Sequence, residues 1–314
     1  MRGTTMSNDD LPIIDAHHHF WDLGTGALPW LTRPPWVPFR YGDYAGIRQN
    51  FLLGDYRAVT APHKVVASVT MEAEWVEDRL VAESHWTAAR HAENPSFPAA
   101  HIARTFLHLP AAEAELERHT HYAFVKGIRH KPAAATRPDA IEPGARASMS
   151  DPDWRRGYVA LAKHGLHFEL QAPWWHVDEL LDLIAAHPET PVVINHAFLP
   201  ADRSPEAMAG WRTAIRRAAS APQVTIKISG IGIAGRPWSL DEQRPVIRDL
   251  IEAFGPDRSL FASNFPVEGL CGSFDTIYSG FKAATADLPQ ADRVKLFHDN
   301  AIRIYRLDLP SANA

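Results

Sequence analysis

Eight short apolar segments, separated by stretches with helical patterning, constrain the fold of this chain more than any other feature. Most are nearly continuous runs of apolar and often β-branched residues, as in parallel strands that are covered on both faces. Each ends in polar residues, glycine or proline. The segments are Pro12–His19, Lys64–Glu72, Ala100–Leu107, Phe124–His130, His167–Pro173, Pro191–Ala197, Val224–Gly230 and Ser259–Val267.

Amphipathic stretches lie between these segments and predict helices. Several begin with a typical N-terminal signal, such as serine followed by proline at Ser204 or the Ser-Leu-Asp-Glu capping box at Ser239. The expected helices are Val76–Glu93, Ala111–His119, Ser150–His164, Val177–His187, Ser204–Ala219 and Ser239–Phe254, with further helices in Phe274–Arg306. Strand and helix alternating eight times predict an α/β fold, a single-domain (β/α)₈ TIM barrel. The turn after the first segment has no GxGxxG pattern, which argues against dinucleotide binding.

The barrel is expected to occupy residues 12–308 as one domain. Residues 1–11 are short, polar and partly acidic, so we expect a disordered leader rather than a signal peptide, and residues 309–314 form a tail. Residues 23–56 are weakly periodic and rich in proline, tryptophan and glycine. We interpret them as an insertion that roofs the site, with Trp21, Trp30 and Trp36 as a candidate apolar lid.

Charge, cysteine content and hydropathy argue against a nucleic-acid-binding protein, a disulfide-stabilised protein and a membrane-spanning protein. The net charge is -5 with both signs interspersed, which gives no footprint for nucleic acid. Cys271 is the single cysteine, so no internal disulfide is expected, and no apolar run reaches the length of a membrane-spanning helix. We therefore expect a cytoplasmic protein that acts on a small molecule without a nucleic-acid or membrane partner, and a homo-oligomer stays open.

Histidines gather where the barrel rule places catalytic groups, at the carboxyl ends of strands. His17 and His19 end the first segment and share a face, because side chains two apart on a strand point the same way. His196 ends the sixth segment. An H-x-H pair that converges with a third histidine indicates a site more strongly than any lone histidine does.

Other strand ends add polar candidates. Arg129 and His130 end the fourth segment, and Glu72 and Glu74 close the second on a shared face. Gln171 and His176 follow the fifth segment, where either is a candidate for contact with substrate. We also expect Lys227, in the seventh segment, to be a buried ion-pair partner rather than a catalyst.

Motifs along nearly the whole chain, from about Pro12 to Leu307, resemble the amidohydrolase-2 family. They are PIIDAHHHFWD, GIR, INH followed by proline four residues later, KISG, SNFPV and NAIRIYRL. The match is to its lactonase-like branch, which includes sugar-acid lactonases, pyrone-dicarboxylate lactonase and sulfomuconolactone hydrolase. The resemblance implies a (β/α)₈ barrel that opens a cyclic ester by adding water to its carbonyl. It also implies that His17, His19 and His196 are site histidines and that Arg129 faces the substrate.

One position departs from the family. Its last strand typically carries Ser/Thr-Asp-Trp/Phe-Pro, and the aspartate activates water or binds metal, whereas this chain has Asn264. An amide does not accept a proton at neutral pH and is a poorer metal ligand than a carboxylate. The usual general base is therefore missing from its usual place.

Three accounts of the site stay open. In the first, His17, His19 and His196 hold a divalent metal such as zinc or manganese, and zinc held in this way lowers the pKa of bound water to about 7. In the second, which does not exclude the first, Glu72, Glu74 or His130 acts as the base from a neighbouring strand end. In the third, the site binds without turning over.

The leading hypothesis is a hydrolase that opens the lactone of a small organic or sugar acid. Its catalytic set is His17, His19, Glu72, Arg129, His196 and Asn264, and its substrate-binding set is Glu74, His130, Gln171 and His176. A metal-dependent decarboxylase, another non-lactone hydrolase and a non-catalytic small-molecule binder are the alternatives. The sequence leaves the substrate's identity open.

Overall fold

The computed structural model describes residues 11–309. The expected leader therefore lies outside the described residues except for Leu11, which is buried, and the expected tail lies outside them except for Leu309. None of the helices in the described part is long and apolar enough to cross a membrane.

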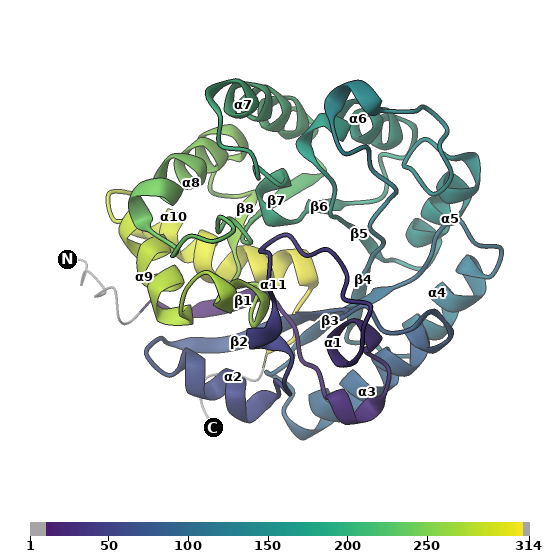
Figure 1. The fold of residues 1–314 in the computed structure, drawn as a ribbon, viewed down its shortest axis with the longest axis horizontal. Helices are drawn as coiled ribbons and strands as arrows, with labels where there is room; N and C mark the ends of the chain where they lie inside the picture. The colour runs from purple at the N-terminus through teal and green to yellow at the C-terminus, as the bar shows by residue number, and fades with distance from the viewer. Residues whose placement is uncertain (1–10, 310–314) are drawn as a thin grey trace.

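Eight parallel strands form one sheet in the order of the chain, and Figure 1 shows the helices arranged around it. The last strand closes on the first just beyond their carboxyl ends. There the backbone N–H of Asn264 donates to the carbonyl of His17, and the backbone N–H of His19 donates to the carbonyl of Phe265, each over 2.7 Å. The predicted (β/α)₈ TIM barrel is confirmed. The strands are β1 (Ile13–His18), β2 (Val65–Met71), β3 (Ala100–Arg104), β4 (Val125–Arg129), β5 (His167–Leu170), β6 (Val192–Ile194), β7 (Val224–Ile228) and β8 (Ser259–Phe261).

The helices follow the predicted pattern with small shifts at their ends. Ser204 caps its helix as expected by accepting from the N–H of Ala207. The capping box predicted at Ser239 is wrong, because the Ser239 hydroxyl donates to Glu242 over 3.3 Å instead of accepting from the backbone. The helices are α1 (Pro29–Thr32), α2 (Leu53–Thr60), α3 (Leu80–Glu93), α4 (Ala112–Thr120), α5 (Pro152–Lys163), α6 (Val177–Ala186), α7 (Pro205–Ala219), α8 (Leu240–Phe254), α9 (Phe274–Ala284), α10 (Gln290–Val294) and α11 (Asn300–Tyr305).

Several strands end earlier than the sequence segments that predicted them. β6 ends at Ile194 and β8 at Phe261, so His196 and Asn264 lie in the loops that follow. Both residues have a left-handed backbone, with φ of 52° and 57° respectively, which a strand does not accommodate. The polar ends of the sixth and eighth predicted segments therefore lie beyond the strands, at the mouth of the barrel.

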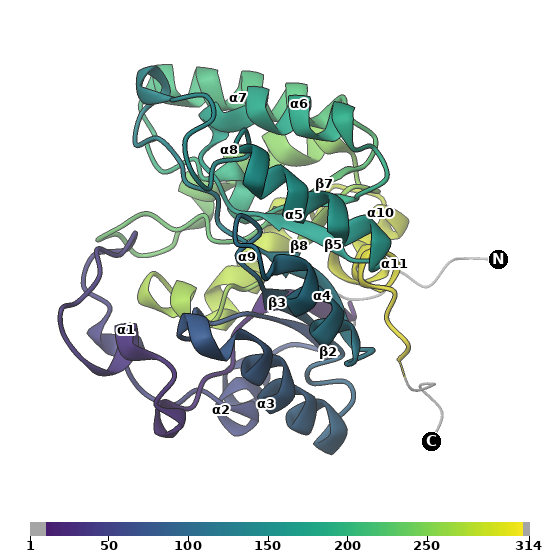
Figure 2. The ribbon, with the colours of Figure 1, turned by 90° about the vertical axis from the view of Figure 1, so that its right-hand side faces the viewer.

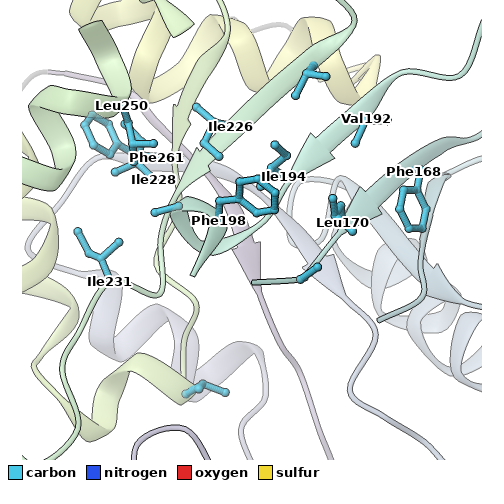
Figure 3. Packing of buried hydrophobic residues seen from close by; sticks show 14 of the residues in the cluster. Phe168, Leu170, Val192, Ile194, Phe198, Ile226, Ile228, Ile231, Leu250 and Phe261 are labelled. Atoms are coloured by element: carbon cyan, nitrogen blue, oxygen red, sulfur yellow. The ribbon is translucent and has the colours of Figure 1, made fainter. Parts of the chain in front are cut away.

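Alternating side chains along β5 and β7 separate an apolar layer from a buried polar centre. Phe168 and Leu170 of β5, and Ile226 and Ile228 of β7, belong to the main hydrophobic cluster, part of which is shown in Figure 3. Between them in sequence, fully buried Glu169 and Lys227 form an ion pair of 2.9 Å. The buried ion pair expected of Lys227 is confirmed.

A second buried carboxylate joins both ends of the chain. Asp15 of β1 accepts hydrogen bonds from the N–H and hydroxyl of Ser263 over 2.7 and 2.6 Å. The hydroxyls of Tyr56 on α2 and Tyr278 on α9 also donate to it, over 3.0 and 3.3 Å. Asp15 thereby ties the first strand to the segment after β8 and to two helices of the outer ring.

Residues 23–56, called the roof segment below, extend from one end of the barrel. Figure 2 shows α1 at that end and α11 at the other. Trp21 and Phe51 exchange two backbone hydrogen bonds of 3.0 Å, which close the base of the segment. The sequence did not predict α2, which begins within the expected insertion and is the barrel helix between β1 and β2.

Candidate active site

A cavity of about 340 Å³ opens at the carboxyl ends of the strands, beneath the roof segment. The roof segment supplies one wall, which is mostly aromatic and apolar, and the strand ends supply a polar floor. The lining residues are His19, Trp21, Trp30, Val37, Pro38, Phe39, Arg40, Glu72, Ala73, Glu74, Arg129, Lys131, Gln171, His196, Asn264 and Val267. A roof over the site was expected, and Trp21 and Trp30 line the cavity as predicted. Trp36 does not line it and is 45% exposed.

Arg129, at the end of β4, is the most firmly held group on the floor. Its Nε donates to Glu72 Oε1 over 2.6 Å, and its Nη2 donates to the Glu72 carbonyl over 2.9 Å. Its Nη1 donates to Gln171 Oε1 over 3.2 Å. These contacts fix the plane of a fork-shaped cation that suits a carboxylate or a developing oxyanion.

Glu72 orients Arg129 and is not suited to act as a base. Burial alone would raise the pKa of Glu72, but the neighbouring Arg129, with Arg104 and Lys131, outweighs burial and keeps that pKa well below its usual range. A carboxylate that is so strongly paired accepts a proton poorly. The structure thus gives no support to the second account as it applies to Glu72.

The three predicted site histidines lie side by side. The ring of His17 is 5.3 Å from that of His19 and 4.5 Å from that of His196. His19 and His196 line the cavity, whereas His17 is fully buried next to them. The shared face of His17 and His19 and their convergence with His196 are as the sequence indicated.

Hydrogen bonds assign the ring nitrogens. The Nδ1 of His19 lies 3.2 Å from the Met71 carbonyl, which only accepts, so Nδ1 carries the proton of the neutral ring and Nε2 keeps the lone pair. The Nδ1 of His196 pairs with the Ser229 hydroxyl over 3.0 Å. Burial, and then Arg129, lower the pKa of His19 to about 3, so its imidazole is neutral at pH 7. Burial lowers the pKa of His17 and His196 as well.

Asn264 borders the cavity next to a buried carboxylate. Its Nδ2 donates to Glu268 Oε2 over 3.5 Å, and Glu268 also accepts from the Tyr41 hydroxyl over 2.5 Å and from the N–H of Gly232 over 2.6 Å. Burial raises the pKa of Glu268. Because Nδ2 is engaged, Oδ1 is the amide atom left to accept a hydrogen bond from a ligand or water.

Two of the predicted substrate-binding residues lie apart from the cavity lining. The Nδ1 of His130 accepts from the N–H of Leu107 over 3.1 Å and from the indole of Trp154 over 2.9 Å. His176 accepts from the N–H of Ala135 over 2.9 Å and pairs with Glu179 through its other nitrogen. Both histidines are buried and engaged with the protein, so neither is placed to act as a base or to bind substrate.

The other two predicted substrate-binding residues, Glu74 and Gln171, do line the cavity. Glu74 is paired with Lys131, and this pairing lowers its pKa. The pairing weakens Glu74 as a base in the same way that Arg129 weakens Glu72. Gln171 contacts Arg129 and is available to a ligand at the same side of the floor.

Comparison with known proteins identifies the family. The Amidohydrolase family profile matches residues 14–307, almost the whole described chain. The chain belongs to the amidohydrolase family. Among curated relatives, it is 34% identical to the uncharacterized protein y4mH of Sinorhizobium fredii, covering 95% of this chain and 99% of that one. It is 26% identical to an L-fucono-1,5-lactonase of Burkholderia multivorans, covering 95% and 97% respectively.

The fold is also shared with solved structures of the family. A Burkholderia multivorans amidohydrolase, solved with bound zinc, has a TM-score of 0.76 and 24% identity to this chain, covering 94% of it and 99% of that structure. The likeness extends over the barrel as a whole, which supports the same architecture for both proteins.

The imidazoles of this amidohydrolase fit a metal only in part. In metal sites a ligating histidine has its other nitrogen hydrogen-bonded, as His19 and His196 do here. His17 does not fit, because Nη1 of cationic Arg129 lies 3.5 Å from its Nε2 and its Nδ1 is buried without a partner. Among residues 11–309, no group of three or more His, Cys, Asp or Glu side chains is arranged to hold a metal ion. The three histidines are thus together, but not as a three-ligand site.

Three site residues were missed by the sequence reasoning. Arg40 and Lys131 line the cavity, and Glu268 supports Asn264 from behind. Lys131 follows the predicted Arg129-His130 pair directly. Glu268 stands four residues after Asn264, and Arg40 is a basic residue within an otherwise aromatic and proline-rich stretch. The sequence positions of these three residues could have suggested them as candidates, but only the fold shows that they lie together at the site.

Proposed function

We propose that this amidohydrolase opens the lactone of a small organic acid by water attack on the ring carbonyl. The observation that carries the proposal is a rigidly held Arg129 facing the same cavity as the neutral imidazoles of His19 and His196. The relatives described as L-fucono-1,5-lactonases, at 26% and 27% identity, support this reaction class.

In the proposed reaction, the lactone carbonyl oxygen faces Arg129, which stabilises the oxyanion as it develops. The Nε2 of His19 accepts a proton from the attacking water, and Asn264 Oδ1 accepts the water's second hydrogen bond. The water oxygen bonds to the carbonyl carbon, the ring C–O bond then breaks, and the proton passes from His19 to the leaving alkoxide. His19 is a weak base in the free protein, but negative charge developing beside Arg129 raises its proton affinity.

The proposed reaction includes no metal-dependent step. Nη1 of the Arg129 guanidinium lies 3.5 Å from Nε2 of His17, and its charge opposes a divalent cation at that nitrogen. The chain's own residues supply the oxyanion contact and the base.

The test is lactone opening by the wild-type protein and by Arg129→Lys, before and after dialysis against a chelator. Lysine keeps the charge but loses the fork that contacts Glu72 and Gln171, so we expect kcat/KM to fall about 100-fold or more. We expect chelation to leave the wild-type rate unchanged. Arg118→Lys, an exposed change on α4, is the matched control and should retain full activity.

Product analysis decides between the alternatives. A ring-opened acid supports the proposal, whereas release of carbon dioxide from an aromatic acid would establish a decarboxylase in its place. Absence of turnover on sugar lactones, muconolactones and pyrone carboxylates, with ligand binding retained, would leave a non-catalytic binder. Loss of the wild-type rate on chelation, restored by zinc or manganese, would overturn the metal-free step.

A further inference from the structure

The charges that line the cavity are paired with one exception. Arg129 is paired with Glu72, and Lys131 with Glu74. The low pKa values of His19 and His196 leave both imidazoles uncharged. Within residues 11–309, no carboxylate lies within 4.0 Å of the fifth charged lining residue, Arg40. Among the charged lining residues in the described part of the chain, Arg40 of the roof segment is therefore the one without an ion-pair partner.

Arg40 is anchored by a backbone carbonyl and an aromatic ring rather than by an ion pair. Its Nη2 donates to the carbonyl of Gly230 over 2.5 Å, and its guanidinium lies 4.7 Å from the ring centre of Tyr41. The anchor uses one of the five N–H donors of the guanidinium, and the residue is solvent-exposed at the cavity mouth. An oriented cation with free donors is suited to a planar anion.

The buried carboxyl of Glu268 interacts electrostatically with Arg40 without forming an ion pair within 4.0 Å: burial raises the pKa of Glu268, and Arg40 lowers it only in part. Glu268 is buried, and its oxygens accept from Tyr41, Gly232 and Asn264. Asn264 itself contributes an uncharged amide at a position where an aspartate would place a negative charge in the cavity. This side of the cavity thus has a guanidinium without an ion pair and an amide in place of a carboxylate.

Resting on the proposed function, we propose that Arg40 determines specificity by binding a carboxylate of the substrate, so that the preferred lactones are anionic rather than neutral. The same wall offers aromatic surface to a flat ring, because Trp30 and Phe39 stack with an interplanar angle of 13° and both line the cavity. The substrate class is then a small, flat lactone that bears a carboxylate, with its reacting carbonyl toward Arg129 and its carboxylate toward Arg40.

The experiment measures binding separately from turnover. Furan-2-carboxylate and furan-2-carboxamide have the same flat ring and differ in charge, and neither is a lactone. Calorimetric titration should show that the wild-type protein prefers the carboxylate, and that Arg40→Gln weakens the carboxylate by about 10- to 100-fold while leaving the amide unchanged. Arg33→Gln, an exposed change in the same roof segment outside the cavity lining, should leave both affinities unchanged.

Turnover gives an independent reading. With 5-oxotetrahydrofuran-2-carboxylate and its methyl ester as substrates, Arg40→Gln should raise KM for the acid more than for the ester, so that the preference of kcat/KM for the acid is lost. Equal binding of carboxylate and amide by the wild-type protein, or unchanged carboxylate affinity in Arg40→Gln, would overturn the inference. A charge preference that depends on Arg40 in a protein that opens no lactone would contradict the proposed hydrolysis and still support anion binding.

Discussion

Asn264 illustrates how a single residue is fixed by its backbone as much as by its chemistry. Its φ of 57° lies in the left-handed region, which asparagine and aspartate adopt more readily than other residues with a side chain. Its N–H donates to the His17 carbonyl across the closure of the barrel. Its side-chain amide donates to Glu268, which an aspartate carboxylate at the same position could not do without being protonated.

We predict that Asn264→Asp destabilises the protein in a pH-dependent way. At pH 8 the new carboxylate meets Glu268 at the distance of the present hydrogen bond, and the free energy of unfolding should fall by roughly 1–3 kcal/mol. At pH 5 the loss should be smaller, since burial raises the pKa of Glu268 and the pair shares a proton as the pH falls. Urea denaturation at the two pH values measures the difference.

Asn264→Gly is the control for this variant, because glycine keeps the left-handed backbone without adding charge. Its effect on stability should be the same at pH 5 and pH 8. An equal loss at both pH values in Asn264→Asp would show that repulsion between the two carboxylates is absent.

Much of the site was predictable at the residue level, and the limits have a physical cause. His17, His19, His196 and Arg129 follow directly from strand ends in a barrel. His176 could not be excluded from sequence, because its two hydrogen bonds, to Ala135 and Glu179, exist only in the folded loop. Arg40 could not be included, because its place depends on how the roof segment returns over the barrel.

At the level of elements, the ion pair of Glu169 and Lys227 joins β5 to β7 beneath the site. Glu169 also accepts from the Tyr305 hydroxyl over 3.0 Å, from α11, and contacts His167 over 3.2 Å. Burial raises the pKa of Glu169, but Lys227 and His167 outweigh it and hold that pKa at about 2. Loss of either partner should destabilise the protein, because it leaves the other charge buried without a counter-charge.

We predict that Glu169→Gln lowers the free energy of unfolding at pH 7 by about 3–5 kcal/mol, since it leaves Lys227 buried without its counter-charge. The folded pKa of Glu169 lies below its unfolded value, so its contribution is present above about pH 4.5 and is lost as the pH falls toward 2. Chemical denaturation between pH 7 and pH 3 should therefore show the gap between wild type and variant narrowing with acid. A gap that stays constant or widens would contradict the assignment.

The secondary elements were predicted well where periodicity decides them and less well at their ends. Continuous apolar runs identified all eight strands, but the predicted sixth and eighth segments ran on into His196 and Asn264. Periodicity does not register the left-handed backbone that ends the strand there. It also failed for α2, since the eight residues from Leu53 carry a mixed polar pattern and follow an aromatic loop.

For the whole molecule, the barrel and the roof segment have different roles. One main hydrophobic cluster runs through the strands and outer helices and includes Leu31, Tyr41 and other residues of the roof segment, whereas residues 33–38 are exposed. Residues 33–38 should therefore contribute little to stability, and ligand binding should depend on both the barrel and the roof segment. Loops held by few buried contacts are generally the less stable parts of a fold.

We predict that replacing residues 33–38 with glycine and serine, at the same length, lowers the midpoint of thermal unfolding by no more than about 2–4 °C. Affinity for furan-2-carboxylate should fall, because Val37 and Pro38 leave the cavity wall. The core change Leu161→Ala, at a fully buried position, should instead cost about 2–5 kcal/mol. Scanning calorimetry compares the two, and a larger loss in the loop variant would show that the roof segment supports the barrel.

The contacts of Asp15 have a consequence for the synthesis of the protein. This carboxylate, near the start of the chain, is satisfied by Ser263 and Tyr278, which leave the ribosome some 250 residues later. His17 and Asn264, which border or lie next to the cavity, are joined across the same closure. Nascent chains that end before Ser263 and Asn264 therefore cannot complete the site, so such an unfinished polypeptide cannot carry out the proposed reaction, however much of its barrel has formed.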